Sequence, residues 1–248
     1  MYLRLNPQIK IIMKKLIPII VLFLSVTISA QTSIFNSLLN KHVDVNGNVN
    51  YKALKKDEAT LDTYLTYLEK TTPNASWSKN KQKAFWINAY NAYTIKLILN
   101  NYPVKSIMNI KKKGKSAWKI SFAVVGGKTY TLDHIEHNIL REKLFDPRIH
   151  VGVNCASGSC PKLHNKAFTE ANIDSELESL MKQFINDSKR NNLKKKNAIQ
   201  ISEIFNWFKG DFTKEGSVVD YINKYANEPV ATDAKIQHLP YNWNLNGK

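Results

Sequence analysis

The longest apolar segment of the chain spans residues 83–100, KAFWINAYNAYTIKLILN, and stops before Tyr102-Pro103. Its apolar side chains fall on almost every face of a helix, which is typical of a helix that is buried on all sides. Asn88 and Asn91 lie three residues apart and share one face of this predicted helix, and buried amides need hydrogen-bond partners. We expect the two asparagines either to tie the helix to a neighbouring loop or to line a site.

Shorter segments with helical or strand-like spacing lie on both sides of this helix. Amphipathic spacing predicts helices within 34–39, 61–68, 133–140, 174–189, 203–208 and 216–226. Two β-rich runs, 120–125 and 128–132, flank Gly126-Gly127 and predict a hairpin. Other predictions are strands at 149–153 and 198–201, an exposed lysine-rich loop at 105–119, and an aromatic tail at 236–245 that packs on the core. This pattern predicts an α+β fold in which helices pack around a small, mainly antiparallel sheet.

The first thirty residues have the pattern of a secretory signal peptide. Two lysines precede an apolar run at 16–26, and Ser29-Ala30 offer small residues for cleavage, while Met13 is an alternative start. The run is shorter than the roughly 20 residues that a membrane span needs. We therefore expect a bacterial periplasmic or secreted protein without a transmembrane span after cleavage, in which residues 31–248 form a single domain.

The chain is strongly basic, with a formal net charge of +16 that falls to +12 without the four basic residues of the predicted leader. Such a charge favours anionic partners, such as envelope polymers, acidic peptides or phospholipid headgroups. Lysine-rich segments at 105–119 and 191–196 could contact such a partner, or they could simply be solvated surface. Because the charges are scattered and carry no interleaved aromatic motif, we expect no nucleic-acid partner.

The only two cysteines, Cys155 and Cys160, follow His150 within a few residues. The strand-like run before Cys155 ends in a turn of small residues, an arrangement that can present a reactive side chain at the mouth of a cleft. In an oxidising compartment the two cysteines could instead form a short-loop disulfide, a local clip worth about 2 kcal/mol. Metal binding with His150 and His164 is a weak alternative because the spacing matches no standard zinc pattern, and thiol–disulfide exchange is another.

Several motifs in order along the chain resemble the DUF547 family, whose domain has no settled activity. They are AFWINAYNA at 84–92, LDHIEHNILR at 132–141, DPRIH and CASGSCP within 146–161, ISEIFNWFKGDF at 201–212 and PYNWNLN at 240–246. The family occurs in exported bacterial proteins and in plant proteins, and its pattern is similar to that of papain-like or transglutaminase-like cysteine enzymes. The resemblance points to Glu136, His150 and Cys155, with Cys160 beside them. Plant relatives often carry serine in place of the second cysteine, which argues against an obligatory disulfide.

A nucleophilic cysteine must be a thiolate, and its base needs a third group for orientation. The sequence therefore predicts Cys155 as nucleophile, His150 as base and Glu136 as orienting carboxylate, with His137 as the alternative base. In a continuous strand His150 and Cys155 would point to opposite faces, so a turn near Asn154 would be required.

Oxyanion donors could come from Asn154, from Asn88 or from the backbone amides of 156–159. We expect no cofactor and no metal. The function predicted is a cysteine-dependent hydrolase or acyl-transfer enzyme that acts on a peptide or amide in the cell envelope. The competing hypothesis is a non-enzymatic binding or scaffold module with a Cys155–Cys160 disulfide and basic loops for an anionic partner.

Overall fold

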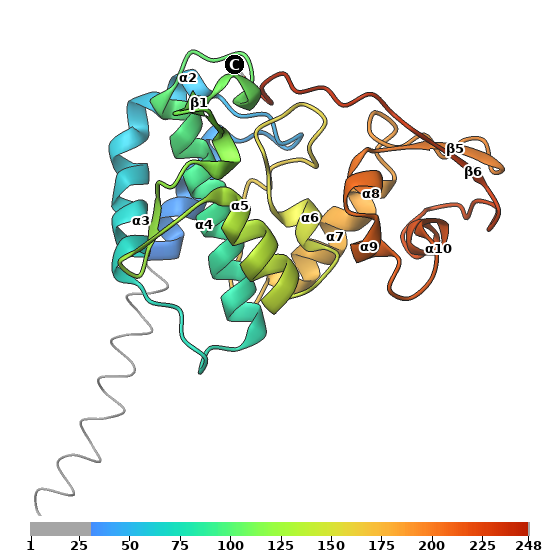
Figure 1. Ribbon diagram of the computed structural model, residues 1–248, viewed down its shortest axis with the longest axis horizontal. Helices are drawn as coiled ribbons and strands as arrows, with labels where there is room; N and C mark the ends of the chain where they lie inside the picture. The colour runs from blue at the N-terminus through green and yellow to red at the C-terminus, as the bar shows by residue number, and fades with distance from the viewer. Residues whose placement is uncertain (1–30, 248) are drawn as a thin grey trace, which may run out of the picture.

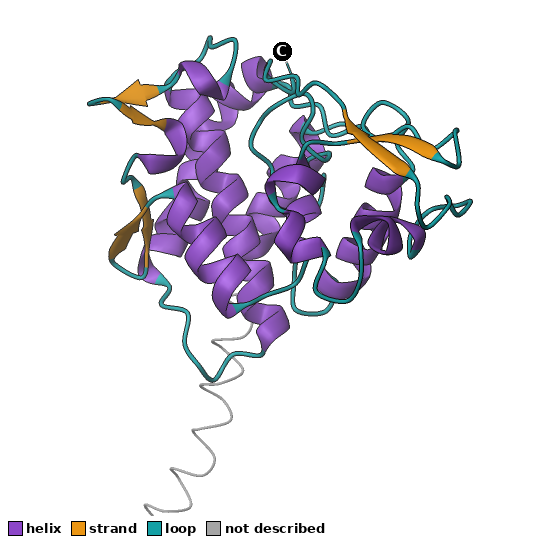
Figure 2. Ribbon diagram, turned by 45° about the vertical axis from the view of Figure 1, so that its right-hand side comes forward, coloured by secondary structure: helices purple, strands orange, loops and turns teal. Residues whose placement is uncertain are grey.

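The computed structural model describes residues 31–247, and the predicted signal peptide at 1–30 lies outside them. Helices occupy the centre of the molecule, and three two-stranded sheets lie at its periphery (Figure 1, Figure 2). The structure thus confirms the α+β fold. The predicted small sheet consists of three separate pairs of strands, two antiparallel and one parallel.

The helical segments are 31–42, α2 (Tyr51–Leu54), α3 (Glu58–Lys70), α4 (Lys79–Asn100), α5 (Leu132–His134), the π-helical η4 (Ile135–Lys143), α6 (Ile149–Gly152), α7 (Ile173–Ile185), α8 (Ile204–Trp207), α9 (Lys209–Phe212) and α10 (Val218–Asn223). Short 3₁₀ turns are η1 (Lys55–Asp57), η2 (Ile107–Asn109) and η3 (Ala117–Lys119). The strand pairs are β1 (Lys111–Lys112) with β2 (Lys115–Ser116), β3 (Ala123–Val125) with β4 (Lys128–Tyr130), and β5 (Ala198–Ile201) with β6 (Lys235–His238). Within residues 31–247, no helix combines the length and the apolar character needed to cross a bilayer.

The central helix α4 is buried along most of its length, as its sequence predicts. Ser78 caps its first turn by accepting a hydrogen bond from the backbone of Lys81 at 3.1 Å. Asn91 donates from Nδ2 to the carbonyl oxygen of Gly152 at 2.8 Å and accepts from the backbone of Asn154 at 2.9 Å. The amide of this asparagine therefore ties α4 to the segment that leads into the cysteines.

Asn88 has the same role nearer the start of α4. Its Nδ2 donates to the carbonyl oxygen of Phe168 at 2.7 Å, and its Oδ1 accepts from the backbone amide of the same residue at 3.0 Å. Both polar groups of this buried amide are thus satisfied by one backbone position. The first of the two predicted roles for the asparagines, tying the helix to a neighbouring loop, is confirmed.

The hairpin predicted around Gly126-Gly127 forms as β3 and β4, with Val125 paired to Lys128. Both glycines have positive φ values, 58° and 73°, which is the conformation required at the two central positions of a tight hairpin turn. The lysine-rich segment at 105–119 is more ordered than the predicted loop, because it contains η2, β1, β2 and η3. Its lysines are exposed while Ile107 is fully buried, so this segment also covers part of the core.

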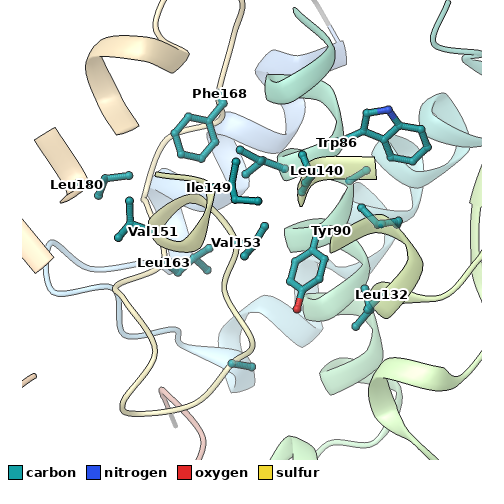
Figure 3. Packing of buried hydrophobic residues seen from close by; sticks show 14 of the residues in the cluster. Trp86, Tyr90, Leu132, Leu140, Ile149, Val151, Val153, Leu163, Phe168 and Leu180 are labelled. Carbon is teal, nitrogen blue, oxygen red and sulfur yellow. The ribbon is translucent and has the colours of Figure 1, made fainter. Parts of the chain in front are cut away.

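The strand predicted at 149–153 is wrong, because this segment forms α6. Figure 3 shows Ile149, Val151 and Val153 packed among core residues from several other elements. Since the segment is buried on all sides, alternation along it does not separate a core face from a solvent face. A Cβ on Gly152 would lie 2.9 Å from Leu177 and 3.0 Å from Ile87, so glycine allows α6 to fit between α7 and α4.

The C-terminal tail runs from β6 back across the molecule to the region of α2 and β1 (Figure 1). On the way its backbone pairs with the cysteine loop, which we define as residues 155–160. The amide of Gly158 donates to the carbonyl oxygen of Asn244 at 2.8 Å, and that of Ser159 donates to Asn242 at 3.1 Å. The predicted aromatic tail therefore does pack back on the molecule, and a portion of it forms one wall of the cleft that holds the cysteines.

Candidate functional site

One cleft collects most of the chemically reactive side chains that the sequence singles out. It has a volume of about 300 Å³. Its lining includes Cys155, Cys160, His150, Glu136, His137, Asp133, Lys119, Tyr90, Trp118, Trp207, Phe208, Tyr241 and Trp243. The η4 helix that carries Glu136 and His137 thus meets the cysteine loop across this space. Asn88 and Asn154 do not line the cleft.

The cysteine loop is shaped by the side chain of Asn154, which is buried directly before it. Asn154 Oδ1 accepts a hydrogen bond from the amide of Ala156 at 2.9 Å, and Nδ2 donates to the carbonyl oxygen of Pro161 at 2.8 Å. Ala156 has a positive φ of 59°, a conformation that is uncommon outside glycine and is found at functional sites. The side-chain amide of Asn154 therefore shapes the loop from outside the lining of the cleft.

The backbone amides of the loop are also largely engaged. Those of Gly158 and Ser159 donate to the tail, and that of Cys160 donates to the carbonyl oxygen of Ser157 at 3.1 Å. Within the turn at 156–159, the backbone amide of Ser157 is the one directed at the Cys155 sulfur, where its hydrogen bond lowers the pKa of the thiol. The side chains of Ser157 and Cys160 also reach this sulfur.

The sulfur of Cys155 lies among three neutral hydrogen-bonding groups. Its Sγ is 3.1 Å from Ser157 Oγ, 3.3 Å from Cys160 Sγ and 3.6 Å from the Tyr241 hydroxyl. The hydrogen bond with Cys160, followed by those with Ser157 and Tyr241, outweighs burial and lowers the pKa of Cys155 to about 7. A substantial fraction of Cys155 is therefore thiolate at neutral pH.

Cys160 has the opposite character. It is buried, and both its burial and the adjacent Cys155 sulfur raise the pKa of its thiol well above the ordinary value. Both cysteines are free thiols in the structure. The pair therefore carries one negative charge. It lies on Cys155, which is the more exposed of the two sulfurs that line the cleft.

At the other end of the cleft, His150 is held by a carboxylate that the sequence did not indicate. His150 Nε2 lies 2.8 Å from Asp211 Oδ2, and the imidazole stacks on Phe208 with ring centroids 4.1 Å apart. Arg141 binds the same carboxylate in two places, from Nε at 2.6 Å and from Nη2 at 3.0 Å. Burial alone would raise the pKa of Asp211, but the hydrogen bonds from His150 and Arg141 hold it well below the usual range.

Asp211, not Glu136, is therefore the group that orients the imidazole of His150. Glu136 is buried on η4 and lies near Tyr90, whose pKa is raised by its own burial and by the charge of Glu136. None of the basic side chains at 31–247 forms an ion pair with Glu136. The only hint of Asp211 in the sequence is its position as the sole acidic residue of the aromatic motif NWFKGDF.

Neither candidate base makes a hydrogen bond to the sulfur of Cys155 in the described part of the chain. His150 and Cys155 line the same cleft, and Nδ1 of His150 has no hydrogen-bond partner within residues 31–247. His137 uses its Nδ1 to contact Arg141 Nη1 at 2.8 Å, so it stabilises the charged network around Asp211. The Cys155 thiolate is consequently formed with help from neutral donors, and the imidazole is left for proton transfer elsewhere in the cleft.

The wall nearest the sulfur is aromatic. Tyr241 lies 4.6 Å from Trp243 and 4.7 Å from Trp207, measured between ring centroids, and Trp118 meets Trp243 edge to face at 5.9 Å. Trp207 is 46% exposed. These rings come from η3, α8 and the tail, so three distant stretches of the sequence form a partly open aromatic surface beside Cys155.

His164, considered for metal binding, pairs with Glu176 at 3.2 Å and does not line the cleft. It is therefore separate from the two cysteines with which it was grouped by sequence. Within residues 31–247, no group of three or more histidine, cysteine, aspartate or glutamate side chains is arranged to hold a metal ion.

Comparison with known proteins gives one match. Residues 74–185 match the family model described as "Protein of unknown function, DUF547". The matched segment contains α4, η4, α6 and the cysteine loop, and thus both Cys155 and His150. The match supports the DUF547 family for this segment of the chain, as the motifs within it predict. Neither the curated proteins nor the solved structures contain a significant match.

Proposed function

We propose that the cleft is the active site of a cysteine-dependent hydrolase or acyl-transfer enzyme that acts on a peptide or amide in the bacterial cell envelope. The observation that carries this proposal is a thiol with its pKa lowered to about 7 in the same cleft as a carboxylate-bound imidazole. A thiolate nucleophile and an oriented histidine are the two groups that thiol-based acyl transfer requires. The predicted signal peptide would deliver the enzyme to the envelope.

The first step is attack of the Cys155 thiolate on the carbonyl carbon of the substrate. The new C–S bond takes its electron pair from sulfur, and the π electrons of the carbonyl move to oxygen. Negative charge thus leaves the sulfur. The Tyr241 hydroxyl, which lies 3.6 Å from Cys155 Sγ and accepts from Ser157 Oγ at 3.0 Å, is then free to donate to the new oxyanion. The same donor would stabilise the charge before and after attack.

In the second step the carbonyl re-forms, the C–N bond breaks, and the departing nitrogen takes a proton from His150. Asp211 Oδ2 lies 2.8 Å from Nε2 of His150. Its negative charge stabilises the protonated imidazole that donates this proton. Water or an acceptor amine then loses a proton to His150 and attacks the thioester, and Cys155 leaves as thiolate. His150 is regenerated in its protonated form, so the cycle closes. This division of roles is similar to that of papain-like enzymes, in which an oriented histidine serves a cysteine.

The aromatic wall favours a substrate that presents flat or apolar groups next to the scissile bond. Trp207, Tyr241 and Trp243 offer ring faces and edges within one cluster beside the nucleophile. A volume of about 300 Å³ is at the lower end of ligand sites and suits a few residues of peptide. A peptidic amide therefore fits the cleft better than a large folded protein.

The proposal is tested by incubating the reduced protein with a library of fluorogenic peptide amides and measuring turnover. Cys155→Ser should abolish turnover, and His150→Asn should abolish it while leaving Cys155 open to alkylation by iodoacetamide. Cys160→Ser is the matched control, because it removes the other thiol of the loop while the serine hydroxyl keeps a hydrogen-bond donor beside Cys155 Sγ, so turnover should persist. Turnover that survives in Cys155→Ser, or an alkylation rate of Cys155 no faster than that of free cysteine at pH 6, would overturn the proposal and leave the scaffold hypothesis.

A further inference from the structure

The cysteine loop contains a second sulfur that forms no bond to the substrate in acyl transfer. Cys160 Sγ lies 3.3 Å from Cys155 Sγ, closer than two sulfur atoms in ordinary contact, yet Cys160 is only 5% exposed. An acyl-transfer enzyme needs one nucleophilic sulfur. Here two sulfurs lie side by side and differ in exposure and in protonation. This arrangement is typical of an attacking thiol next to a resolving thiol.

We propose that Cys155 and Cys160 form a dithiol that exchanges with peptidic disulfides, in which Cys155 attacks the external disulfide and Cys160 resolves the mixed disulfide. This activity requires both sulfurs, and it does not require acyl transfer or His150. Its substrate is a disulfide between cysteine residues of small peptides, and its product is the intramolecular Cys155–Cys160 disulfide. The reverse reaction would donate that disulfide to a peptide dithiol.

The reaction balances without any further oxidant. The Cys155 thiolate attacks one sulfur of the external disulfide, the S–S bond breaks, and one external thiolate leaves. Cys160 then gives up its proton to the departing thiolate, and its sulfur attacks Cys155 Sγ, which expels the second external thiolate. One protein thiolate, one protein thiol and one disulfide thus become a protein disulfide, an external thiol and an external thiolate. The external disulfide is reduced by two electrons, which the two cysteines supply.

The charges in the loop impose this order. Before the reaction, burial and the charge of Cys155 hold the pKa of Cys160 well above its ordinary value, so Cys160 stays protonated. Once Cys155 is bound in a mixed disulfide it carries no charge, and the repulsion disappears. The backbone amide of Cys155 already points to Cys160 Sγ at 3.2 Å and would stabilise the thiolate that forms there. The second thiol is therefore released for reaction only after the first has reacted.

The geometry of the loop allows the two sulfurs to bond. They need to approach by roughly 1.3 Å to reach the length of a disulfide bond. Asn154 and the tail hold the backbone on both sides of the loop, so the approach falls to the two side chains. The aromatic wall beside Cys155 offers the external peptide the same contacts as it offers an amide substrate.

The test uses oxidised glutathione as the probe and the full chain, reduced and freed of reductant. In the wild-type protein we expect two thiols to disappear together, with release of two glutathione molecules and no lasting adduct. Cys160→Ser should accumulate a mixed disulfide with glutathione on Cys155, visible as a mass increase. Cys155→Ser should react more than about tenfold more slowly, because only the protonated, buried Cys160 remains. Both changes replace sulfur by oxygen, and circular dichroism checks that each variant is folded.

A stable glutathione adduct on the wild-type protein would overturn the proposal, because it would show that Cys160 does not resolve. Equal rates for Cys155→Ser and Cys160→Ser would overturn the proposed order of attack. The two activities can fail separately. If Cys160→Ser still turns over peptide amides but accumulates the mixed disulfide with glutathione, both the acyl-transfer and the dithiol proposals are supported. Absence of amide turnover in every variant, with normal exchange, removes the acyl-transfer proposal and leaves the dithiol.

Discussion

The two ends of the cleft use different chemistry to prepare a reactive group. At the sulfur end, Cys155 is surrounded by a thiol, two hydroxyls and the backbone amide of Ser157, all of them neutral groups. At the imidazole end, His150 meets a full negative charge on Asp211, which is itself bound by Arg141. Neutral donors bring the pKa of the thiol only to about 7, so the thiolate keeps much of its nucleophilicity. The carboxylate instead fixes the orientation of a ring whose task is to pass a proton.

The nucleophile and the proton carrier are therefore tuned independently. In a thiolate–imidazolium pair, a change at the histidine would also change the thiol. Here no histidine bonds to Cys155 Sγ within residues 31–247, so changes at one end of the cleft should leave the other largely unaffected. Single substitutions can therefore separate the two ends.

The largest effect is expected for Asp211→Asn, which removes the charge that holds His150. Turnover of a peptide amide should fall roughly 100-fold or more, the scale of a lost general acid–base catalyst. The iodoacetamide alkylation of Cys155, followed from pH 5 to 9, should keep its midpoint near 7. Asp133→Asn is the control, because Asp133 lines the cleft but does not bind His150. A midpoint that moves with Asp211→Asn would show that the two ends are coupled.

A buried ion pair outside the cleft should affect stability and not chemistry. Asp146 binds Lys83 Nζ at 2.6 Å and Arg148 Nη2 at 3.0 Å, and Lys83 is buried. Asp146→Asn leaves a buried lysine without its counter-charge and should reduce the free energy of unfolding by about 3 kcal/mol. Urea unfolding measures this loss. Turnover per folded molecule should stay within twofold of wild type, and a larger drop would place Asp146 in the catalytic network.

The same ion pair predicts how stability depends on acid. Burial works against ionisation, but Arg148 and Lys83 lower the pKa of Asp146 to about 2 in the folded protein. Because the folded pKa lies below the unfolded one, the stabilisation is fully present above about pH 4 and is lost as the pH falls toward 2. This group should account for about 2 kcal/mol of that loss. Urea unfolding at a series of pH values should show the loss in wild type and a flatter profile in Asp146→Asn.

The smallest effect is expected at the sulfur end, from Tyr241→Phe. The change removes one of the four hydrogen bonds that lower the pKa of Cys155 and should raise the alkylation midpoint by up to about one pH unit, the scale of a single hydrogen bond. The fraction of Cys155 that is thiolate at pH 7 should fall several-fold, while the orientation of His150 is unchanged. Tyr225→Phe, far from the cysteines, is the matched control. An unchanged midpoint would show that Ser157 and Cys160 suffice.

The sequence predicted the elements whose signal is local. The Gly-Gly hairpin and the buried helix α4 follow from residues next to one another, and both formed as expected. At 149–153, alternating branched residues suggested a strand, but tertiary packing between α4 and α7 selects a helix. Burial on all sides removed the physical meaning of the alternation.

In the candidate site, too, the sequence predicted what depends on neighbouring residues and missed what depends on tertiary folding. The cysteine motif and His150 are near one another in the sequence and share the cleft. Asp211, however, is 61 residues from His150 along the chain, and only tertiary folding brings it to the imidazole. Glu136 was chosen because it stands next to a histidine in the sequence, although its carboxylate lies by Tyr90. Proximity in sequence was a sound guide for the sulfur end and a poor one for the imidazole end.

The pairing of the tail with the cysteine loop has a consequence for the timing of activity. Tyr241 supplies a donor to Cys155, and the backbone of 242–246 holds Ala156, Gly158 and Ser159 in place. A growing or unfolded chain in which these residues have not yet returned to the loop lacks that donor and that support. Its Cys155 would titrate nearer to an ordinary thiol and react slowly at neutral pH. Folding therefore controls reactivity, because the nucleophile acquires its full set of donors only after residues 241–246 have docked on the cysteine loop.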